Sequence, residues 1–128
     1  MYLIDGRSST VVTLTVGTGG VTKGDLLVWS SNTVVKAAAG DKTDDIVGIA
    51  LATAVDTATV QVELTLDRII RAPYAGTETN LALGKVYDIT DADNVNIDDV
   101  ADGSCLCVGF DKVANTIDFI IVQADRFV

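Results

Sequence analysis

The sequence predicts an all-β protein, folded as a small barrel or sandwich of eight or nine short strands. Three observations support this prediction. Apolar and polar residues alternate along much of the chain, turn residues separate the apolar runs at short intervals, and helical patterns are nearly absent. The chain has 128 residues and no proline- or serine-rich linker, which is the size of one domain. We therefore expect one β-domain with at most one short helix.

The individual strands are predicted from period-two alternation and from short β-branched runs. In VQVELTL the residues Val60, Val62, Leu64 and Leu66 face one way and the polar residues between them face the other, which is typical of a half-buried strand. Similar alternation over Val12, Leu14 and Val16 predicts an early strand, and IDFIIVQ predicts a late one. The remaining expected strands are LLVW, TVVK, IVGIAL, KVYDI, NVNI and CLCVGF.

Turn chemistry separates these runs. Ser30-Ser31-Asn32 and Asp91-Ala92-Asp93-Asn94 carry the side chains that favour tight turns. The helical signal is limited to a short turn expected around Asn80 to Leu83. Because the single proline, Pro73, has no N–H to donate, we expect the preceding strand to end at Arg71 and a mid-chain loop to begin at Pro73.

The two halves of the chain share a set of landmarks. These are Gly24-Asp25-Leu26 with Gly84-Lys85-Val86, Asn32 with Asn94, and Val47-Gly48-Ile49 with Val108-Gly109-Phe110. Each half then ends in a strand that follows a short turn, at Ala58-Thr59-Val60 and at Asn115-Thr116-Ile117. We interpret this as a pseudo-repeat of two three-stranded β units that complete one another's sheet. The alternative is a chance similarity between short hairpins.

Charge and composition exclude several classes of partner. Nine basic residues stand against eighteen acidic ones, and the resulting net charge of -9 repels phosphate, so no nucleic-acid binding is expected. Hydrophobic residues make up 48% of the chain, which suggests that other chains cover some apolar surface. No apolar run reaches transmembrane length, and the first twenty residues lack a signal-peptide pattern, so no membrane partner is expected.

The reactive residue types point away from catalysis. Cys105 and Cys107 lie two positions apart, so on a strand they share a face and are predicted to be core residues of a protein made in a reducing compartment. The chain has no histidine, which removes histidine-based triads and the common zinc sites. Neighbouring carboxylates such as Asp44-Asp45 and Asp98-Asp99 face opposite ways on a strand. We predict no enzyme and no cofactor.

One acidic segment partly fits a calcium loop. Asp91, Asp93 and Asp102 occupy its first, third and twelfth positions. However, Val95 stands at the fifth position, and Asn96 replaces the glycine of the sharp turn. We therefore predict a hairpin turn with solvated aspartates and no metal site, with a structural calcium ion as the alternative.

A family resemblance follows from the runs VTKGDLLVW, VVKAA, DDIVGIALATA, VQVELTLDRIIRAP and LALGKVYDI. Together they resemble the small head decoration, or capsid cement, proteins of tailed bacteriophages. The resemblance covers most of Val21 to Val122. One departure is the turn Asp56-Thr57-Ala58, where many members of that family carry a glycine.

The resemblance implies a structural protein of the virion. It would form a homotrimer on the outer surface of the expanded capsid, bind the major capsid protein and cement neighbouring shell subunits, after synthesis in the cytoplasm of the host bacterium. Residues 21–128 would form the decoration-type domain. Residues 1–20 would be an arm that pairs with a sheet edge on the shell or on another copy, or else an ordinary first strand of the domain.

The candidate residues for contact with the capsid or with another subunit are apolar side chains of the N-terminal segment and two aromatic residues further along the chain. They are Tyr2, Leu3, Ile4, Val12, Leu14, Trp29 and Tyr74. The competing interpretation is a surface-displayed glycan-binding module or a head- or tail-fibre module. Trp29, Tyr74 and Tyr87 would form the platform of a glycan site, but aromatic residues make up only 5% of the chain, which favours packing roles for them.

Overall fold

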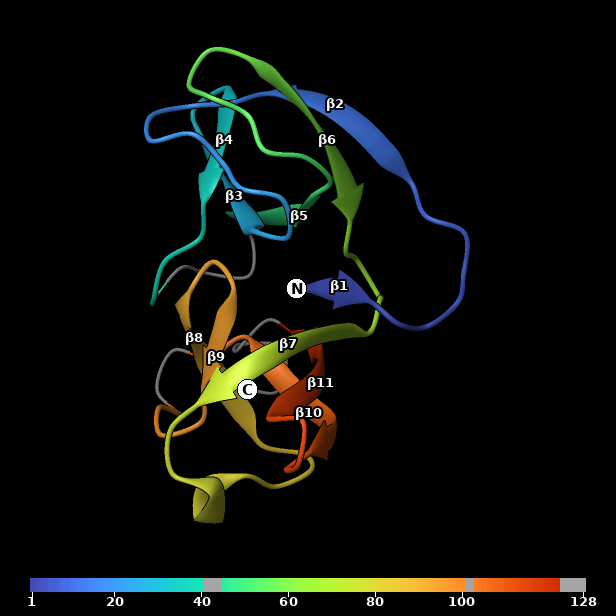
Figure 1. Ribbon diagram of the computed structural model, residues 1–128, viewed down its shortest axis with the longest axis vertical. Coiled ribbons are helices and arrows are strands. Elements are labelled where there is room, and N and C mark those ends of the chain that lie inside the picture. The colour runs from blue at the N-terminus through green and yellow to red at the C-terminus, as the bar shows by residue number, and fades with distance from the viewer. Residues whose placement is uncertain (41–44, 101–102, 123–128) are drawn as a thin grey trace.

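The computed structural model describes residues 1–40, 45–100 and 103–122, and these form an all-β structure of two curved sheets that lie one above the other (Figure 1). We call the sheet from the N-terminal half the upper sheet and the other the lower barrel. The strands are β1 (Tyr2–Leu3), β2 (Val11–Thr15), β3 (Leu26–Ser30), β4 (Thr33–Lys36), β5 (Ile46–Ala50), β6 (Thr59–Leu64), β7 (Ile70–Ala75), β8 (Val86–Asp91), β9 (Asn94–Asn96), β10 (Cys105–Asp111) and β11 (Thr116–Ile121).

The two sheets have the same topology. The upper sheet has the order β2-β6-β5-β3-β4, and the lower barrel has the equivalent order β7-β11-β10-β8-β9, with β1 added beside β7. The lower barrel closes because β7 and β9 pair in parallel from Tyr74 and Val95 onward. The end strands of the upper sheet meet at the equivalent position, in a single parallel bridge between Val16 and Val34.

The predicted pseudo-repeat is confirmed, but its expected strand content is wrong. Each unit has five strands and forms its own sheet, rather than three strands that complete a shared one. The glycine landmark is also out of register. Gly48 pairs with Leu27 and Leu64, and the residue with the equivalent partners, Tyr87 and Ile121, is Cys105 rather than Gly109.

The described residues hold eleven strands instead of eight or nine, and the two unexpected ones are β1 and β7. The loop expected at Pro73 is wrong, since Pro73 lies inside β7. Tyr74 donates its N–H to the Asn115 carbonyl oxygen at 3.3 Å, so the nitrogen of the preceding residue faces away from β11. On that side β1 pairs with Ile70 and Arg71, and β9 pairs with Tyr74 and Ala75. Pro73 lies between these two pairings, so it removes no hydrogen bond from the ladder.

The expected helical turn is a single turn of 3-10 helix, η2 (Glu78–Asn80), which starts two residues before the predicted Asn80 to Leu83. The Asp98 carboxylate fixes its start. It accepts hydrogen bonds from the Thr77 N–H and from the Asn80 side-chain amide, both at 2.8 Å. The turn is therefore held by a carboxylate from beyond β9, which a local helix pattern does not reveal.

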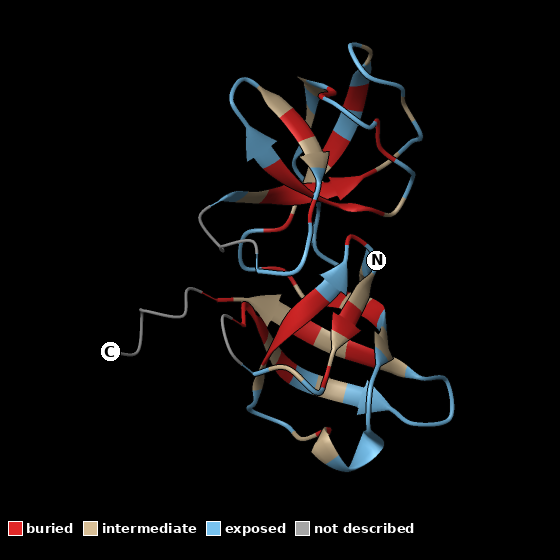
Figure 2. Ribbon diagram, turned by 90° about the vertical axis from the view of Figure 1, so that its left-hand side faces the viewer, coloured by how far each residue is buried: buried red, intermediate tan, exposed pale blue. Residues whose placement is uncertain are grey.

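Two apolar clusters form the core, and one of them joins the two units. The lower cluster contains Tyr87 and Phe119 from the barrel, but also Leu26, Val28 and Ile49 from the upper sheet. The second cluster lies inside the upper sheet and is built mainly of valines. Figure 2 shows buried residues along the inner faces of both units. The chain therefore packs as one body, in which strands of the upper sheet help to cover the lower barrel.

Residues 1–20 supply two strands of this chain's own sheets. β1 pairs with β7, and β2 pairs with β6 in an uninterrupted antiparallel register from Val11↔Glu63 to Thr15↔Thr59. Between them, the Asp5 carboxylate accepts hydrogen bonds from the Arg68 guanidinium at 2.6 and 2.8 Å and from the Ile69 N–H at 3.1 Å. This buried contact fastens the β1–β2 connection to the β6–β7 connection.

Candidate functional site

The acidic segment that partly fits a calcium loop is organised as a turn. The Asp91 carboxylate accepts a hydrogen bond from the Asp93 N–H at 3.1 Å. Hydrogen bonding with Asp93 lowers the pKa of Asp91, and the neighbouring Asp91 carboxyl raises the pKa of Asp93. Asp102 lies outside the described residues. Within residues 1–40, 45–100 and 103–122, no group of three or more His, Cys, Asp or Glu side chains could hold a metal ion.

The two cysteines lie on the inner face of β10. Cys105 and Cys107 are both free and both belong to the lower apolar cluster. Burial raises the pKa of Cys105 to about 12, and burial also raises the pKa of Cys107. Neither thiol is therefore a reactive thiolate at neutral pH, and both fill space in the core as the sequence predicts.

The predicted contact residues do not form one surface. Leu3 packs against the lower cluster, while Val12 and Leu14 pack against the upper one. Ile4 is half-buried and donates its N–H to the Ile69 carbonyl oxygen at 3.0 Å. Tyr74 is half-buried, and its hydroxyl donates to Glu78 at 3.0 Å. The side chains of Tyr2 and Trp29 are exposed, but they belong to different sheets.

The aromatic residues considered for a glycan platform are also separated. Tyr87 is fully buried, and its hydroxyl donates to the Asn80 carbonyl oxygen and accepts from the Ala82 N–H. Trp29 lies on β3 of the upper sheet, and Tyr74 lies on β7 of the lower barrel. These three side chains therefore make no common platform.

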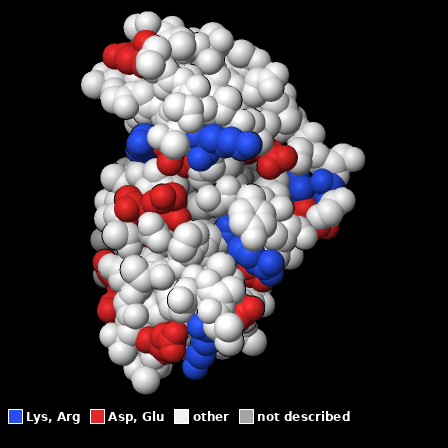
Figure 3. Space-filling model, viewed as in Figure 1, with Lys and Arg blue, Asp and Glu red and all other residues white. Residues whose placement is uncertain are grey.

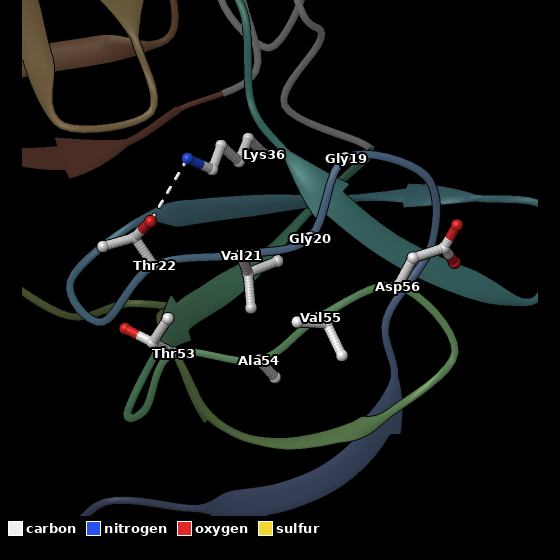
Figure 4. Close-up of a pocket in the computed structure, with 9 residues that line it drawn as sticks. All are labelled: Gly19, Gly20, Val21, Thr22, Lys36, Thr53, Ala54, Val55 and Asp56. Atoms are coloured by element: carbon white, nitrogen blue, oxygen red, sulfur yellow. Dashed lines mark hydrogen bonds between the residues drawn. The ribbon is translucent and has the colours of Figure 1, made fainter.

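A shallow pocket of about 340 Å³ opens in the upper sheet between the β2–β3 and β5–β6 connections (Figure 4). Its main polar groups are Lys36 and, on the opposite side, Asp56. The Lys36 amine donates to the Thr22 hydroxyl at 3.2 Å and lies 3.5 Å from the Asp25 carboxylate. Because its charge is already paired within the chain, the amine is poorly placed to attract an anionic ligand.

One strand edge of the upper sheet is open. Val16 donates its N–H to the Ala58 carbonyl oxygen, and Thr10 accepts from the Leu64 N–H, so the even-numbered residues of β2 bond to β6. The backbone groups of Val11 and Thr13 therefore face the other way. Among the described residues they have no partner strand, because β4 meets β2 only at Val16. We call these unpaired groups of Val11 and Thr13 the β2 edge.

Several large apolar side chains of the lower barrel are exposed on and around the β10–β11 hairpin. Gly84 donates its N–H to the Cys107 carbonyl oxygen at 2.9 Å, which places the segment before β8 beside β10. Four exposed large side chains lie in these two segments and in the β10–β11 hairpin, and we call them the hairpin patch. They are Leu83, Val108, Phe110 and Val113.

The hairpin patch has basic neighbours in an acidic molecule. The Lys112 amine lies 5.9 Å from the centre of the Phe110 ring, within the range of a cation–π contact. Lys85 follows Leu83 by two residues and is exposed.

Val113 is 96% exposed, which leaves a branched apolar side chain almost entirely in water. The hairpin also carries one exposed acid, Asp111, whose carboxylate accepts hydrogen bonds from the Val113 and Ala114 N–H groups at 2.9 and 3.1 Å. Exposed apolar side chains of this kind are suited to docking against an apolar area of a partner.

The sequence matches no protein-family model and no curated protein. In the described parts of the chain, no helix is long and apolar enough to cross a membrane. Sequence reasoning missed both the β2 edge and the hairpin patch. The edge depends on where β4 ends relative to β2, and the patch depends on two segments that are about twenty-five residues apart in the chain.

Proposed function

We propose that this protein is a structural component of a tailed-bacteriophage virion. It binds the outer surface of the capsid and cements neighbouring copies of the major capsid protein, which stabilises the head. The observation that carries the proposal is the hairpin patch, a group of exposed apolar side chains on and around the β10–β11 hairpin of a two-unit β fold. The resemblance of the sequence to capsid decoration proteins supplies the identity of the partner.

The hairpin patch supports attachment through burial of apolar area. Covering one large aliphatic or aromatic side chain stabilises a contact by about 1.5–3 kcal/mol before the costs of association. Leu83, Phe110 and Val113 together would give a contact of moderate strength. Lys85 and Lys112 would select a shell surface with acidic groups nearby.

Self-association would strengthen this attachment. In a homotrimer, three hairpin patches engage the shell together, and each further contact forms at a high effective concentration. A trimer that bridges shell subunits resists their separation more strongly than a single copy. Assembly would take place in the host cytoplasm and on the virion surface, and the two buried, free cysteines suit a reducing compartment.

The test is attachment of the purified protein to particles that lack it. Val113→Asp places a charge in the hairpin patch without disturbing a buried group, since Val113 is 96% exposed. We expect V113D to fold normally and to bind at least about tenfold more weakly. The matched control is Val55→Asp, because Val55 is 73% exposed but lies in the β5–β6 connection, away from the lower barrel. Equal binding by wild type, V113D and V55D would show that the hairpin patch does not contact the shell.

A further inference from the structure

We infer that the β2 edge is a contact between copies of this chain, in which the backbone groups of Val11 and Thr13 pair with a second copy. The inference deepens the proposed self-association and rests on it, because it names the surface at which the copies meet. Three features of the described residues support it: the edge is unprotected, β2 itself carries no charge, and the exposed side chains of β2 are neutral.

The first feature is the absence of protection. Strand edges are normally covered, bent by a bulge, or marked with proline or charged residues. In this chain the equivalent strand β7 is covered by β1 over its first residues and carries Pro73 beyond them. β2 has the sequence VVTLT, keeps a regular register with β6 and carries neither proline nor charge. An edge of this kind is a ready template for another strand.

The second feature is the distribution of charge. Residues 1–40 carry three basic and two acidic side chains, whereas residues 41–128 carry six basic and sixteen acidic ones. Both early acids, Asp5 and Asp25, are largely buried and hydrogen-bonded within the chain. In Figure 3 the upper sheet presents few acidic atoms on the visible face, and the lower barrel presents more.

This distribution favours a second copy as the occupant. Copies of a chain with a net charge of -9 repel one another over most of their surface. No acidic residue occurs between Gly6 and Gly24, and among the β6 residues paired with β2 only Glu63, opposite Val11, is charged, so two copies that meet at β2 bring few like charges close together. In such a contact, the β2 strands that meet are identical and uncharged.

The third feature is what the pairing would cover. Val11, Thr13 and Thr15 are exposed on the solvent face of β2, and Val11 is 44% exposed. A strand from a second copy would satisfy the N–H and C=O groups of Val11 and Thr13 and would shield these side chains from water. Thr and Val are also residues that pair well across strands.

The experiment compares full-length wild type, Thr13→Pro and Thr13→Ala by native mass spectrometry and light scattering at micromolar concentration. T13P removes the outward N–H, which makes no hydrogen bond within the described chain, so the β2–β6 ladder stays intact. T13A removes the side chain and keeps the N–H. A further variant, Thr13→Lys, adds a charge to the edge while keeping every backbone donor, and it serves if T13P does not fold.

We expect wild type and T13A to be oligomeric and T13P and T13K to dissociate at least about tenfold more readily. Hydrogen exchange of the Val11 and Thr13 amides should be slow in the wild-type oligomer and fast in the monomeric variants. An oligomer that T13P and T13K leave unchanged would overturn the inference and leave the proposed self-association standing.

A monomeric wild-type protein would overturn both the inference and the proposed self-association. If T13P then lost attachment to particles, a segment of the shell protein would be the occupant of the β2 edge instead. The attachment test with V113D stands apart from these outcomes, because it uses a surface on the lower barrel and is read on particles.

Discussion

Thr57 has a backbone conformation that usually requires glycine. Its φ is 71°, in the left-handed region, where a β-branched side chain is strained. The turn Asp56-Thr57-Ala58 contains no glycine. The backbone conformation of this turn suits glycine. Thr57 adopts it nevertheless, and its N–H donates to the Val16 carbonyl oxygen at 2.9 Å.

Replacing this residue should therefore stabilise the protein. Thr57→Gly removes the strain of the left-handed conformation but gives the unfolded chain more freedom, so we expect a net gain of about 0.5–1 kcal/mol in unfolding free energy. The control is Thr59→Gly, at an exposed position of β6 with extended backbone, where the same change should be destabilising. Urea denaturation of both variants measures the difference, and a destabilised T57G would contradict the account.

Asp5 provides a second prediction at this scale, which concerns pH. Hydrogen bonding from Arg68 holds the pKa of Asp5 well below its ordinary value of 3.8. Because the folded-state pKa is depressed, this contact stabilises the fold fully above about pH 4 and loses its effect as the pH falls towards the folded-state pKa. We expect the melting temperature of the wild type to drop as the pH is lowered from 5 to 2.

The Asp5→Asn variant should melt several degrees lower than wild type at neutral pH, since it leaves the Arg68 charge unpaired. It should also depend less on pH in the acidic range, because the linked carboxyl is gone. The control is Asp67→Asn, which alters an exposed carboxyl nearby and should behave as wild type. Parallel loss of stability with pH in wild type and D5N would show that other carboxyls dominate the acid transition.

At the scale of elements, β7 shows how a strand can accommodate proline. Pro73→Ala should change the unfolding free energy by less than about 1 kcal/mol, because the Pro73 nitrogen faces away from β11, at a position between the residues that pair with β1 and those that pair with β9. Ala72→Pro should cost about 2 kcal/mol or more, since Ala72 is buried and its backbone bonds to β11 opposite Ile117. Chemical denaturation distinguishes the two, and similar costs for P73A and A72P would contradict this register.

The strands that could be predicted are those with strong local patterns. β2, β6 and β11 follow from alternation, and six further strands follow from short apolar runs between turns. β1 could not be predicted because two residues are too few to show a period. β7 could not be predicted because a proline normally indicates the end of a strand. Only the pairing register shows that the Pro73 nitrogen faces away from β11.

The surfaces were harder to predict than the strands. Exposure of Leu83 and Val113 depends on how the segment before β8 lies beside β10, which no local pattern specifies. Leu3, Val12 and Leu14 were expected at contacts with other chains, but within this fold they pack against the cores. An apolar residue on a short strand gives the same sequence pattern whether it packs in the core of its own chain or contacts another chain.

At the scale of the whole molecule, two equivalent β units share part of their packing. Leu26, Val28 and Ile49 of the upper sheet extend the lower apolar cluster, so a force applied to one unit is transmitted to the other through packed side chains. The β2 edge lies on the upper sheet, and the hairpin patch lies on the lower barrel. Under the proposed function, the upper sheet would join copies to one another and the lower barrel would contact the shell.

The most direct test of this account is quantitative mass spectrometry of purified virus particles, which counts this chain against the major capsid protein. Because a decoration protein covers the whole shell, the account predicts a ratio near one to one. Absence of the chain from the particles, or a trace amount, would contradict the proposed function.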